Sequence, residues 1–311
     1  MRVFITGATG VIGRRVLPLL LERGHHVSVL ARRGSGAART DLVRQGAVVV
    51  EASLFDPGAL SVAVAAHDVV INLATHVPPS SVRMFMPGAW RENDRIRRDG
   101  SANLVNAALG ASVQRLIQES YAPIYDSHGS SWIDENEPVH PGRYNRTILD
   151  AEGAVRRFAE AGRAGVVLRF AAFYGPDAGQ LKDMLRAIRR GWAPLPGAPD
   201  SYVSAVSHDD AAAAVIAALE LPSGVYNVVD DWPVSHREFV DALADAAGVA
   251  HPRLLPAWTA KLGGSVARAL TRSLRISNRK LRDASGWAPR YPSVREGFPA
   301  ALAASGPGPV A

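Results

Sequence analysis

The sequence predicts an α/β fold built on a doubly wound parallel sheet, and three observations support this. Short apolar runs, each about the length of a buried strand, recur along the chain and alternate with helix-like stretches. Residues 3–13 read Val-Phe-Ile-Thr-Gly-Ala-Thr-Gly-Val-Ile-Gly, so that an apolar run breaks into three glycines spaced three apart. A length of 311 residues suits one large domain of this class, or such a domain with a smaller lobe.

The first expected element is a strand over Val3 to Ile5, followed by a helix over 11–23 and a second strand over 26–31. Glycine between strand and helix permits a tight turn, a close approach of ligand to backbone, and close packing of helix on strand. Free N–H groups and the positive end of the helix dipole then favour a pyrophosphate. The unit therefore predicts a Rossmann-type dinucleotide site. Its expected contacts are Thr6, Gly7, Thr9, Gly10, Val11, Ile12 and Gly13.

The later elements continue this alternation and then change character. Strands are expected at 47–51, 69–73, 115–118 and 166–170, and helices at 41–45, 57–66, 90–109 and 144–162. After about residue 175, Pro- and Gly-rich pieces separate shorter elements, with helical patterns at 235–247 and 258–270. We therefore expect a Rossmann domain over 1–175 and a smaller, partly interleaved substrate-binding lobe over 176–311, with a frayed tail at 305–311.

Composition excludes several classes of function. Cysteine is absent, which removes disulfides, thiolate catalysis and cysteine metal sites. The formal charge is +6, but the basic residues are scattered at helical spacing without interleaved aromatics, so no nucleic-acid partner is expected. The nine histidines form no metal-binding motif, and no metal site is expected. Without a membrane-length apolar run or a secretory signal, a cytoplasmic protein with no membrane contact is predicted.

The ends of the other strands indicate which nicotinamide cofactor would bind. Arg32 and Arg33 close the second strand, where an acidic residue would favour NAD and arginine suits the 2′-phosphate of NADP. NADP is therefore predicted over NAD. Further cofactor contacts are expected from Ser53 and Leu54 beside the adenine, and from Leu73, Ala74 and Thr75 after the fourth strand.

Several motifs in a fixed order extend this interpretation over almost the whole chain. They are Thr6 to Gly13, Val70 to Ala74, Gly100 to Leu104, Arg169 followed by Tyr174 to Pro176, His208 to Asp210, Gly224 to Val228, and Gly286 to Pro289. With them the chain resembles the extended short-chain dehydrogenase/reductase superfamily, whose members include NAD-dependent epimerases and dehydratases. The resemblance implies a homodimer formed through helices 90–109 and 144–162.

The resemblance also implies a catalytic constellation, from which this sequence departs. The family pairs a tyrosine that transfers a proton with a lysine four residues later, which lowers the tyrosine pKa and holds the nicotinamide ribose. Here the tyrosine is Tyr144, but the lysine position is Ile148. The family's serine position falls at Tyr121, next to Ser120, and its central-helix asparagine falls at Arg97. Either Ser120 serves through a shifted loop, or the Tyr121 hydroxyl takes over as donor or acid.

We therefore expect an NADP-dependent oxidoreductase or epimerase/dehydratase-like enzyme that acts on the carbonyl or hydroxyl of a small molecule, with specialised metabolism as one setting for it. Tyr144 or Tyr121 would handle the proton. The substrate would meet residues of loops above the sheet, with aromatic surface that suggests a ligand less polar than a nucleotide sugar. These candidates are His76, Trp132, Phe173, Trp192 and Tyr202. The alternatives are a non-redox isomerase, lyase or cyclase on the same fold, and a non-enzymatic NADP-sensing regulator.

Overall fold

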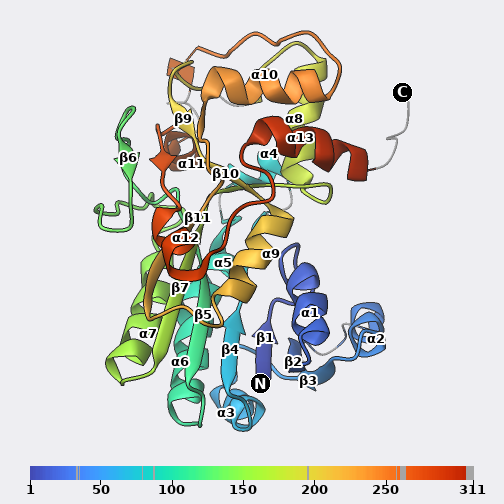
Figure 1. Ribbon diagram of the computed structural model, residues 1–311, viewed down its shortest axis with the longest axis vertical. Helices are drawn as coiled ribbons and strands as arrows, with labels where there is room; N and C mark the ends of the chain where they lie inside the picture. The colour runs from blue at the N-terminus through green and yellow to red at the C-terminus, as the bar shows by residue number, and fades with distance from the viewer. Residues whose placement is uncertain are drawn as a thin grey trace.

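The computed structural model describes residues 1–32, 34, 36–78, 80–86, 88–194, 196–256, 258–259 and 264–305 (Figure 1). The predicted cofactor residue Arg33 and residues 306–311 of the predicted tail lie outside the described residues. Within them, no helix is both long enough and apolar enough to cross a bilayer.

A seven-stranded parallel sheet forms the centre of the fold, in the order β11-β7-β5-β4-β1-β2-β3. The strands are β1 (Arg2–Thr6), β2 (His26–Ala31), β3 (Val48–Glu51), β4 (Val69–Asn72), β5 (Arg115–Tyr121), β7 (Ala164–Phe170) and β11 (Gly224–Val228). The chain starts in the middle and winds first to one edge and then to the other. This confirms the predicted Rossmann-type, doubly wound fold, with the strand order reversing between β1 and β4.

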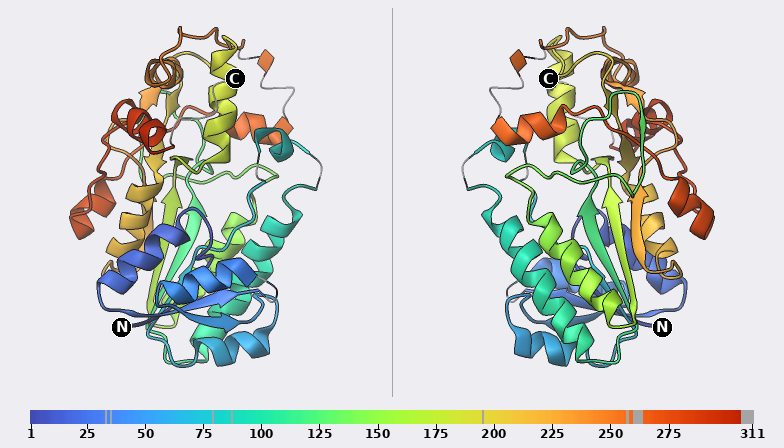
Figure 2. Two further views of the ribbon diagram at one scale, coloured as in Figure 1. Left: turned by 90° about the vertical axis from the view of Figure 1, so that its right-hand side faces the viewer. Right: turned by 90° about the vertical axis from the view of Figure 1, so that its left-hand side faces the viewer.

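Helices cover both faces of this sheet because alternate strand residues are buried on opposite sides. Val3 and Ile5 pack with α1 (Gly13–Glu22) and α9 (His208–Ala217), whereas Phe4 packs on the other face. That second face carries α3 (Pro57–Val64), α6 (Ser101–Leu109) and α7 (Ile148–Glu160), while α2 (Gly36–Arg44) lies beside β3. Figure 2 shows the two helical layers on either side of the sheet.

A smaller lobe lies beyond the carboxyl ends of the strands (Figures 1 and 2). Its core packs α8 (Gly179–Arg189), α10 (His236–Ala246) and α13 (Val294–Ala304) around Tyr174 and Phe298. Short strands complete it: β6 (Trp132–Ile133) with β13 (Arg275–Ile276), β8 (Ala172–Tyr174) with β10 (Ala205–Ser207), and β9 (Tyr202–Val203) with β12 (Val234–Ser235). The remaining helices are α4 (Ser81–Met84), α5 (Arg91–Arg95), α11 (Gly264–Leu270) and α12 (Arg279–Ser285).

Most predicted elements are present, and three differences concern the site or the sheet. The helix predicted over 144–162 begins at Ile148 and ends at Glu160, because residues 143–147 form turns with bonds such as Ile148 N–H to the Asn145 carbonyl. The single helix predicted over 90–109 is interrupted by a π-helical turn, η1 (Ile96–Gly100). The chain also returns to the sheet after residue 175, because α9 packs on α1 and the unpredicted strand β11 pairs with β7. The domain boundary at 175 stays a prediction.

Candidate active site

The glycine turn between β1 and α1 has the geometry that a pyrophosphate requires. Gly7 has φ +75°, and a Cβ there would collide with the Leu73 carbonyl at the end of β4. A Cβ on Gly13 would collide with the carbonyl of Gly7. No side chain caps α1, and the N–H groups of Val11 and Ile12 donate to no acceptor in the described part of the chain. The turn therefore fits a dinucleotide, because these backbone donors have no acceptor among the described residues and the glycines themselves carry no side chain.

Replacing Gly7 by alanine is expected to abolish NADPH binding and to lower the free energy of unfolding by about 2–3 kcal/mol, through backbone strain and overpacking. Gly24 is a matched control, because it has φ +74° but nothing within 4 Å of an added Cβ. Gly24→Ala should lose some stability and keep cofactor affinity. Fluorescence titration with NADPH and denaturant unfolding measure both quantities, and tight NADPH binding by Gly7→Ala would contradict this assignment.

The other predicted cofactor residues lie at the carboxyl ends of neighbouring strands. Arg32 follows β2, is exposed, and has no partner among the described residues. The Ser53 hydroxyl accepts from the Phe55 N–H at 3.1 Å, and buried Leu54 packs against Gly100. Leu73 is buried after β4, Ala74 is half-buried, and Thr75 is exposed. These positions form one edge with the glycine turn, as adjacent parallel strands require.

Buried polar groups fix the strand ends below this edge. Thr6 Oγ1 donates to Asn72 Oδ1 at 2.5 Å, and Asn72 Nδ2 donates to Gln118 Oε1 at 2.8 Å. All three side chains are almost fully buried, so each hydrogen bond offsets the cost of burying its polar atoms. Thr6 therefore contributes to the site by holding β1 and β4 in register.

The structure brings Tyr121 and Tyr144 together although they are far apart in sequence. Both belong to a small cluster with Trp90 and, from α11, Val266 and Ala269. The Trp90 and Tyr144 rings meet edge to face with centroids 5.0 Å apart. The Tyr144 hydroxyl is buried and lies beside the Tyr121 phenol without a well-aligned hydrogen bond to any described residue. Two phenols therefore stand where the family places one tyrosine and one serine.

Both phenols hold their protons strongly. Burial raises the pKa of Tyr121 to about 12, although contact with Tyr144 and the charge of Arg97 oppose the rise. The pKa of Tyr144 lies well above its ordinary value, first because of burial and then because of the neighbouring Tyr121. Near neutral pH the pair is therefore two neutral phenols, which can donate hydrogen bonds or a proton.

Tyr144 and Ile148 do not stand one turn apart on a helix. Tyr144 lies in the turns before α7, and Ile148 is the first residue of that helix with only 1% of its surface exposed. The Thr147 hydroxyl donates to the Asp94 carboxylate at 2.8 Å, which ties this turn to α5. The positively charged partner that the family supplies from position 148 is thus replaced here by buried hydrocarbon.

Ser120 is turned away from the tyrosine pair. As neighbours on β5, Ser120 and Tyr121 point to opposite faces of the sheet. The buried Ser120 hydroxyl donates to Glu152 Oε1 at 2.6 Å on α7. Glu152 also accepts two bonds from Arg169, at 2.9 and 2.7 Å, and Arg169 donates to the Tyr125 hydroxyl at 2.8 Å. This arrangement gives Ser120 a structural partner and leaves Tyr121 as the group beside Tyr144.

Arg97, at the family's asparagine position, is a buried cation near the two phenols. It lies in η1 with 4% of its surface exposed and donates through Nη2 to Glu119 at 3.0 Å. Its Nε is buried and has no hydrogen-bond partner among the described residues. The chain therefore keeps a positive charge at this site, but supplies it from a different segment.

The five predicted substrate residues have separate contacts in the structure. The Arg275 guanidinium lies between Trp132 and Tyr202, 4.3 and 4.9 Å from their ring centroids. Phe173 packs on Phe170, with centroids 5.3 Å apart. The last two members of the predicted set lie elsewhere: Trp192 forms an isolated bridge with Arg253, and His76 is exposed with its N–H donating to Asn93 Oδ1.

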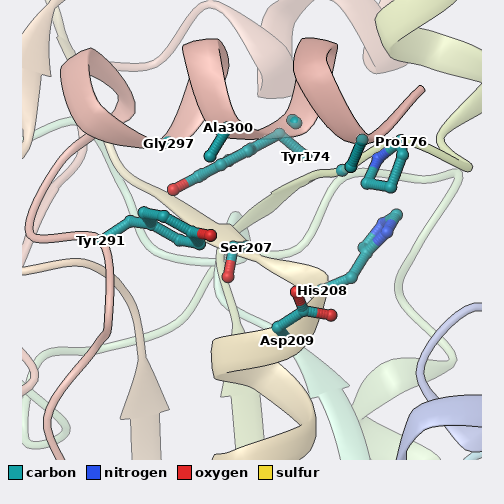
Figure 3. A pocket seen from close by; sticks show the side chains of 11 residues that line it. Tyr174, Pro176, Ser207, His208, Asp209, Tyr291, Gly297 and Ala300 are labelled. Carbon is teal, nitrogen blue, oxygen red and sulfur yellow. The ribbon is translucent and has the colours of Figure 1, made fainter. Parts of the chain in front are cut away.

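A small cavity lies between α9 and α13, lined by Tyr174, Tyr291 and His208 among others (Figure 3). Its volume of about 60 Å³ suits a few water molecules rather than a substrate. Burial, followed by the charge of Arg15, lowers the pKa of His208 to about 4, so the ring is neutral. Ser207 caps α9 by accepting from the Asp210 N–H, as its position before that helix suggests.

Sequence reasoning missed two residues of the tyrosine site. Trp90 packs on Tyr144, and Glu119 holds Arg97 from the strand that carries Tyr121. Glu119 could have been found, because a residue two positions before Tyr121 shares its face of the strand. Trp90 belongs to a loop whose aromatic side chains could be expected to face a substrate, but its contact with Tyr144 depends on the tertiary fold.

Comparison with known proteins agrees with this architecture. The family model described as "NAD dependent epimerase/dehydratase family" matches residues 3–228. The chain is 34% identical to a 3-diazoavenalumate denitrifying reductase of Streptomyces sp. over 308 residues, which cover 96% of this chain and 99% of that one. It is 28% identical to a dihydroquinoline-1-oxide ketoreductase of Stigmatella aurantiaca, with 88% and 82% covered.

Solved structures show the same fold. A human epimerase family protein crystallised with NADPH superposes with a TM-score of 0.76 at 21% identity, covering 97% of this chain and 99% of the other. The UDP-glucose 4-epimerase of Thermotoga maritima gives 0.78 at 23% identity, covering 97% and 98%. Family match, reductase relatives and a turn suited to a dinucleotide agree on a nicotinamide-dependent enzyme of the reductase and epimerase type. The chain belongs to the NAD dependent epimerase/dehydratase family.

Proposed function

We propose that this enzyme is an NADPH-dependent reductase of a small, weakly polar molecule, with the Tyr121–Tyr144 pair as its proton donor. The observation that carries the proposal is that two protonated phenols lie together, while the family's lysine position after Tyr144 holds the buried Ile148. A reaction that starts by oxidising an alcohol, as an epimerisation through a ketone does, needs a base that removes the hydroxyl proton. Neutral phenols suit the opposite direction, in which a carbonyl is polarised and then protonated.

The chain's own residues supply the following steps. The Tyr121 and Tyr144 hydroxyls orient the substrate oxygen and donate a hydrogen bond to it, which draws electron density from the carbonyl carbon. The cofactor, when bound at the glycine turn, supplies the hydride for that carbon. One phenol then gives its proton to the new alkoxide, so that carbonyl, hydride and proton together form an alcohol. Trp90 and the apolar side chains around Tyr144 exclude water from the pair.

The relatives support a reductase and suggest what it reduces. Two have names that describe reduction in specialised metabolism, one of a quinoline ketone and one of a diazo compound. A diazo group is a second candidate acceptor, because an aryl diazonium takes hydride at its terminal nitrogen without a proton donor and then loses N₂ as the arene forms. The absence of the family's lysine is compatible with that reaction, and the 34% identical relative favours it.

A panel assay tests the proposal. Aryl alkyl ketones, cyclic diketones and aryl diazonium salts are incubated with enzyme and NADPH, and loss of absorbance at 340 nm is followed together with product formation. Consumption of NADPH with one equivalent of alcohol or of N₂ supports reduction, and identifies the acceptor. Turnover of any panel member without a change at 340 nm would favour the non-redox isomerase, lyase or cyclase instead.

The preference for NADPH is a proposal that rests on Arg32, which is exposed at the end of β2 and has no partner among the residues that the structure describes. Removing one charge-assisted contact to the 2′-phosphate costs about 1.5–3 kcal/mol. Arg32→Ala is therefore expected to weaken NADPH binding roughly 10- to 100-fold and to leave NADH binding unchanged. Arg23→Ala, at the far end of α1, is the matched control. Equal losses of affinity for NADPH and NADH would show that Arg32 does not contact the 2′-phosphate.

Assembly and signalling are separate proposals. The homodimer stays a prediction, checked by light scattering coupled to size-exclusion chromatography. The NADP-sensing regulator would require a protein partner whose binding depends on the cofactor, and no described contact bears on it.

A further inference from the structure

We propose that Arg97, held by Glu119 in the π-helical turn, takes over the electrostatic role of the missing lysine and stabilises the negative charge that forms when the tyrosine pair gives up its proton. This inference rests on the proposed function of Tyr121 and Tyr144. It makes Arg97 a positioning residue, which acts through the phenols rather than on the substrate.

The first support is the burial and incomplete pairing of Arg97. Arg97 is 4% exposed, and its Nη2 donates to both carboxylate oxygens of Glu119. The buried Nε has no partner among the described residues. Leaving an N–H of a buried cation unpaired costs free energy, so proteins retain such a group where its charge serves a purpose. The carboxylate that partly offsets this cost, Glu119, lies two residues before Tyr121 on the same face of β5.

The second support is the local backbone. A π-helical turn adds a residue to a helix and is often found at functional sites. Here η1 separates α5 from α6, and within it Arg97 is buried while its neighbour Arg98 is exposed and pairs with Asp99. The turn therefore presents one of two adjacent arginines to the interior.

The third support comes from the charges around the two phenols. From η1, Arg97 lowers the pKa of both; from β5, Glu119 raises that of Tyr121. Arg272 also lowers the pKa of Tyr144, but its Nη1 donates to the carbonyls of Tyr125 and His140 at 2.7 and 3.0 Å. Hydrophobic side chains from α4, α11 and Trp90 also pack on the pair. Among the described residues, Arg97 is thus a cation that acts on both members.

The test measures the acidity of the pair without cofactor or substrate. The full chain is labelled with 3,5-difluorotyrosine, whose phenol is more acidic than that of tyrosine, and titrated by ¹⁹F NMR. Tyr121→Phe and Tyr144→Phe assign the two signals. Arg97→Met is expected to decrease the acid dissociation constants of both phenols about tenfold or more, and Arg97→Lys to restore part of the loss. Arg98→Met, one residue away, should leave both unchanged.

A second variant, expected to shift the acid dissociation constant in the opposite direction, distinguishes an electrostatic effect from a merely structural one. Glu119→Gln removes the negative charge beside Arg97 and is expected to increase the acid dissociation constant of Tyr121. If Arg97→Met does not fold, Glu119→Gln and Arg97→Lys decide the question. Unchanged constants in a folded Arg97→Met variant, or an unchanged or decreased constant in Glu119→Gln, would overturn the proposal.

The outcome is independent of the proposed reaction. The titration can succeed even if no panel substrate is reduced, in which case Arg97 tunes the phenols but the reductase assignment fails. If reduction is found and the titration fails, Tyr121 and Tyr144 act without Arg97. With an active substrate, Arg97→Met should lower kcat and leave the KM for NADPH unchanged.

Discussion

Tyr144→Phe is expected to lower kcat for reduction of an active ketone by about 10²- to 10⁴-fold, the range for removal of a positioned general acid. The ring would still fill its place against Trp90, because phenylalanine differs only by the hydroxyl, so stability should change little. Tyr121→Phe should cause a loss of similar size, since each phenol supports the other. The measurement is kcat and KM with NADPH at fixed substrate, together with a thermal melt of each variant.

The size of the loss in the double variant separates the two roles. If one phenol donates the proton and the other positions that donor, the kcat of the double variant should be only slightly lower than that of the less active single variant. Tyr226→Phe is the control, because its hydroxyl donates only to the Pro222 carbonyl at the edge of the sheet. Full activity in both Tyr121→Phe and Tyr144→Phe would remove the pair from the mechanism of ketone reduction.

The second large effect concerns stability. Glu152→Gln is expected to lower the free energy of unfolding by about 3–5 kcal/mol, because it leaves the Arg169 charge buried without its carboxylate. It also weakens the hydrogen bond from Ser120. Urea unfolding followed by circular dichroism measures the change, with equal m-values confirming a two-state comparison.

A matched control lies on the same helix. Glu160, the last residue of α7, is exposed and has no ion pair with any residue that the structure describes, so its replacement by glutamine should cost less than about 0.5 kcal/mol. A loss below about 1 kcal/mol in Glu152→Gln would show that water or a rearranged Arg169 compensates, and that the network does not hold β5, β7 and α7 together.

The sequence could predict the sheet and the cofactor turn because their signals are local. Val3 to Ile5 form an apolar run directly before a glycine turn, which indicates a buried strand. Position 7 requires a residue that tolerates φ +75° and lacks a Cβ. The sequence also shows directly that Ile148 and Tyr121 differ from the residues that the family has at these positions. Element bounds near the site were less predictable: α7 starts at 148 because the turn before it is drawn toward Trp90 and Asp94, which lie about 50 residues earlier.

The sequence by itself determined a dinucleotide-binding α/β fold, its family and the absence of the usual lysine, since each follows from residue types at fixed spacing. Only the tertiary structure decided which groups meet. The alternation of β5 points Ser120 and Tyr121 to opposite faces, and the packing of the chain brings Tyr121 and Tyr144 into one cluster. Arg97 is buried within a π-helical turn. Which side chains are buried together, and which charges lie near them, depends on contacts between segments that are far apart in the chain. The spacing of residues along the sequence does not reveal these contacts.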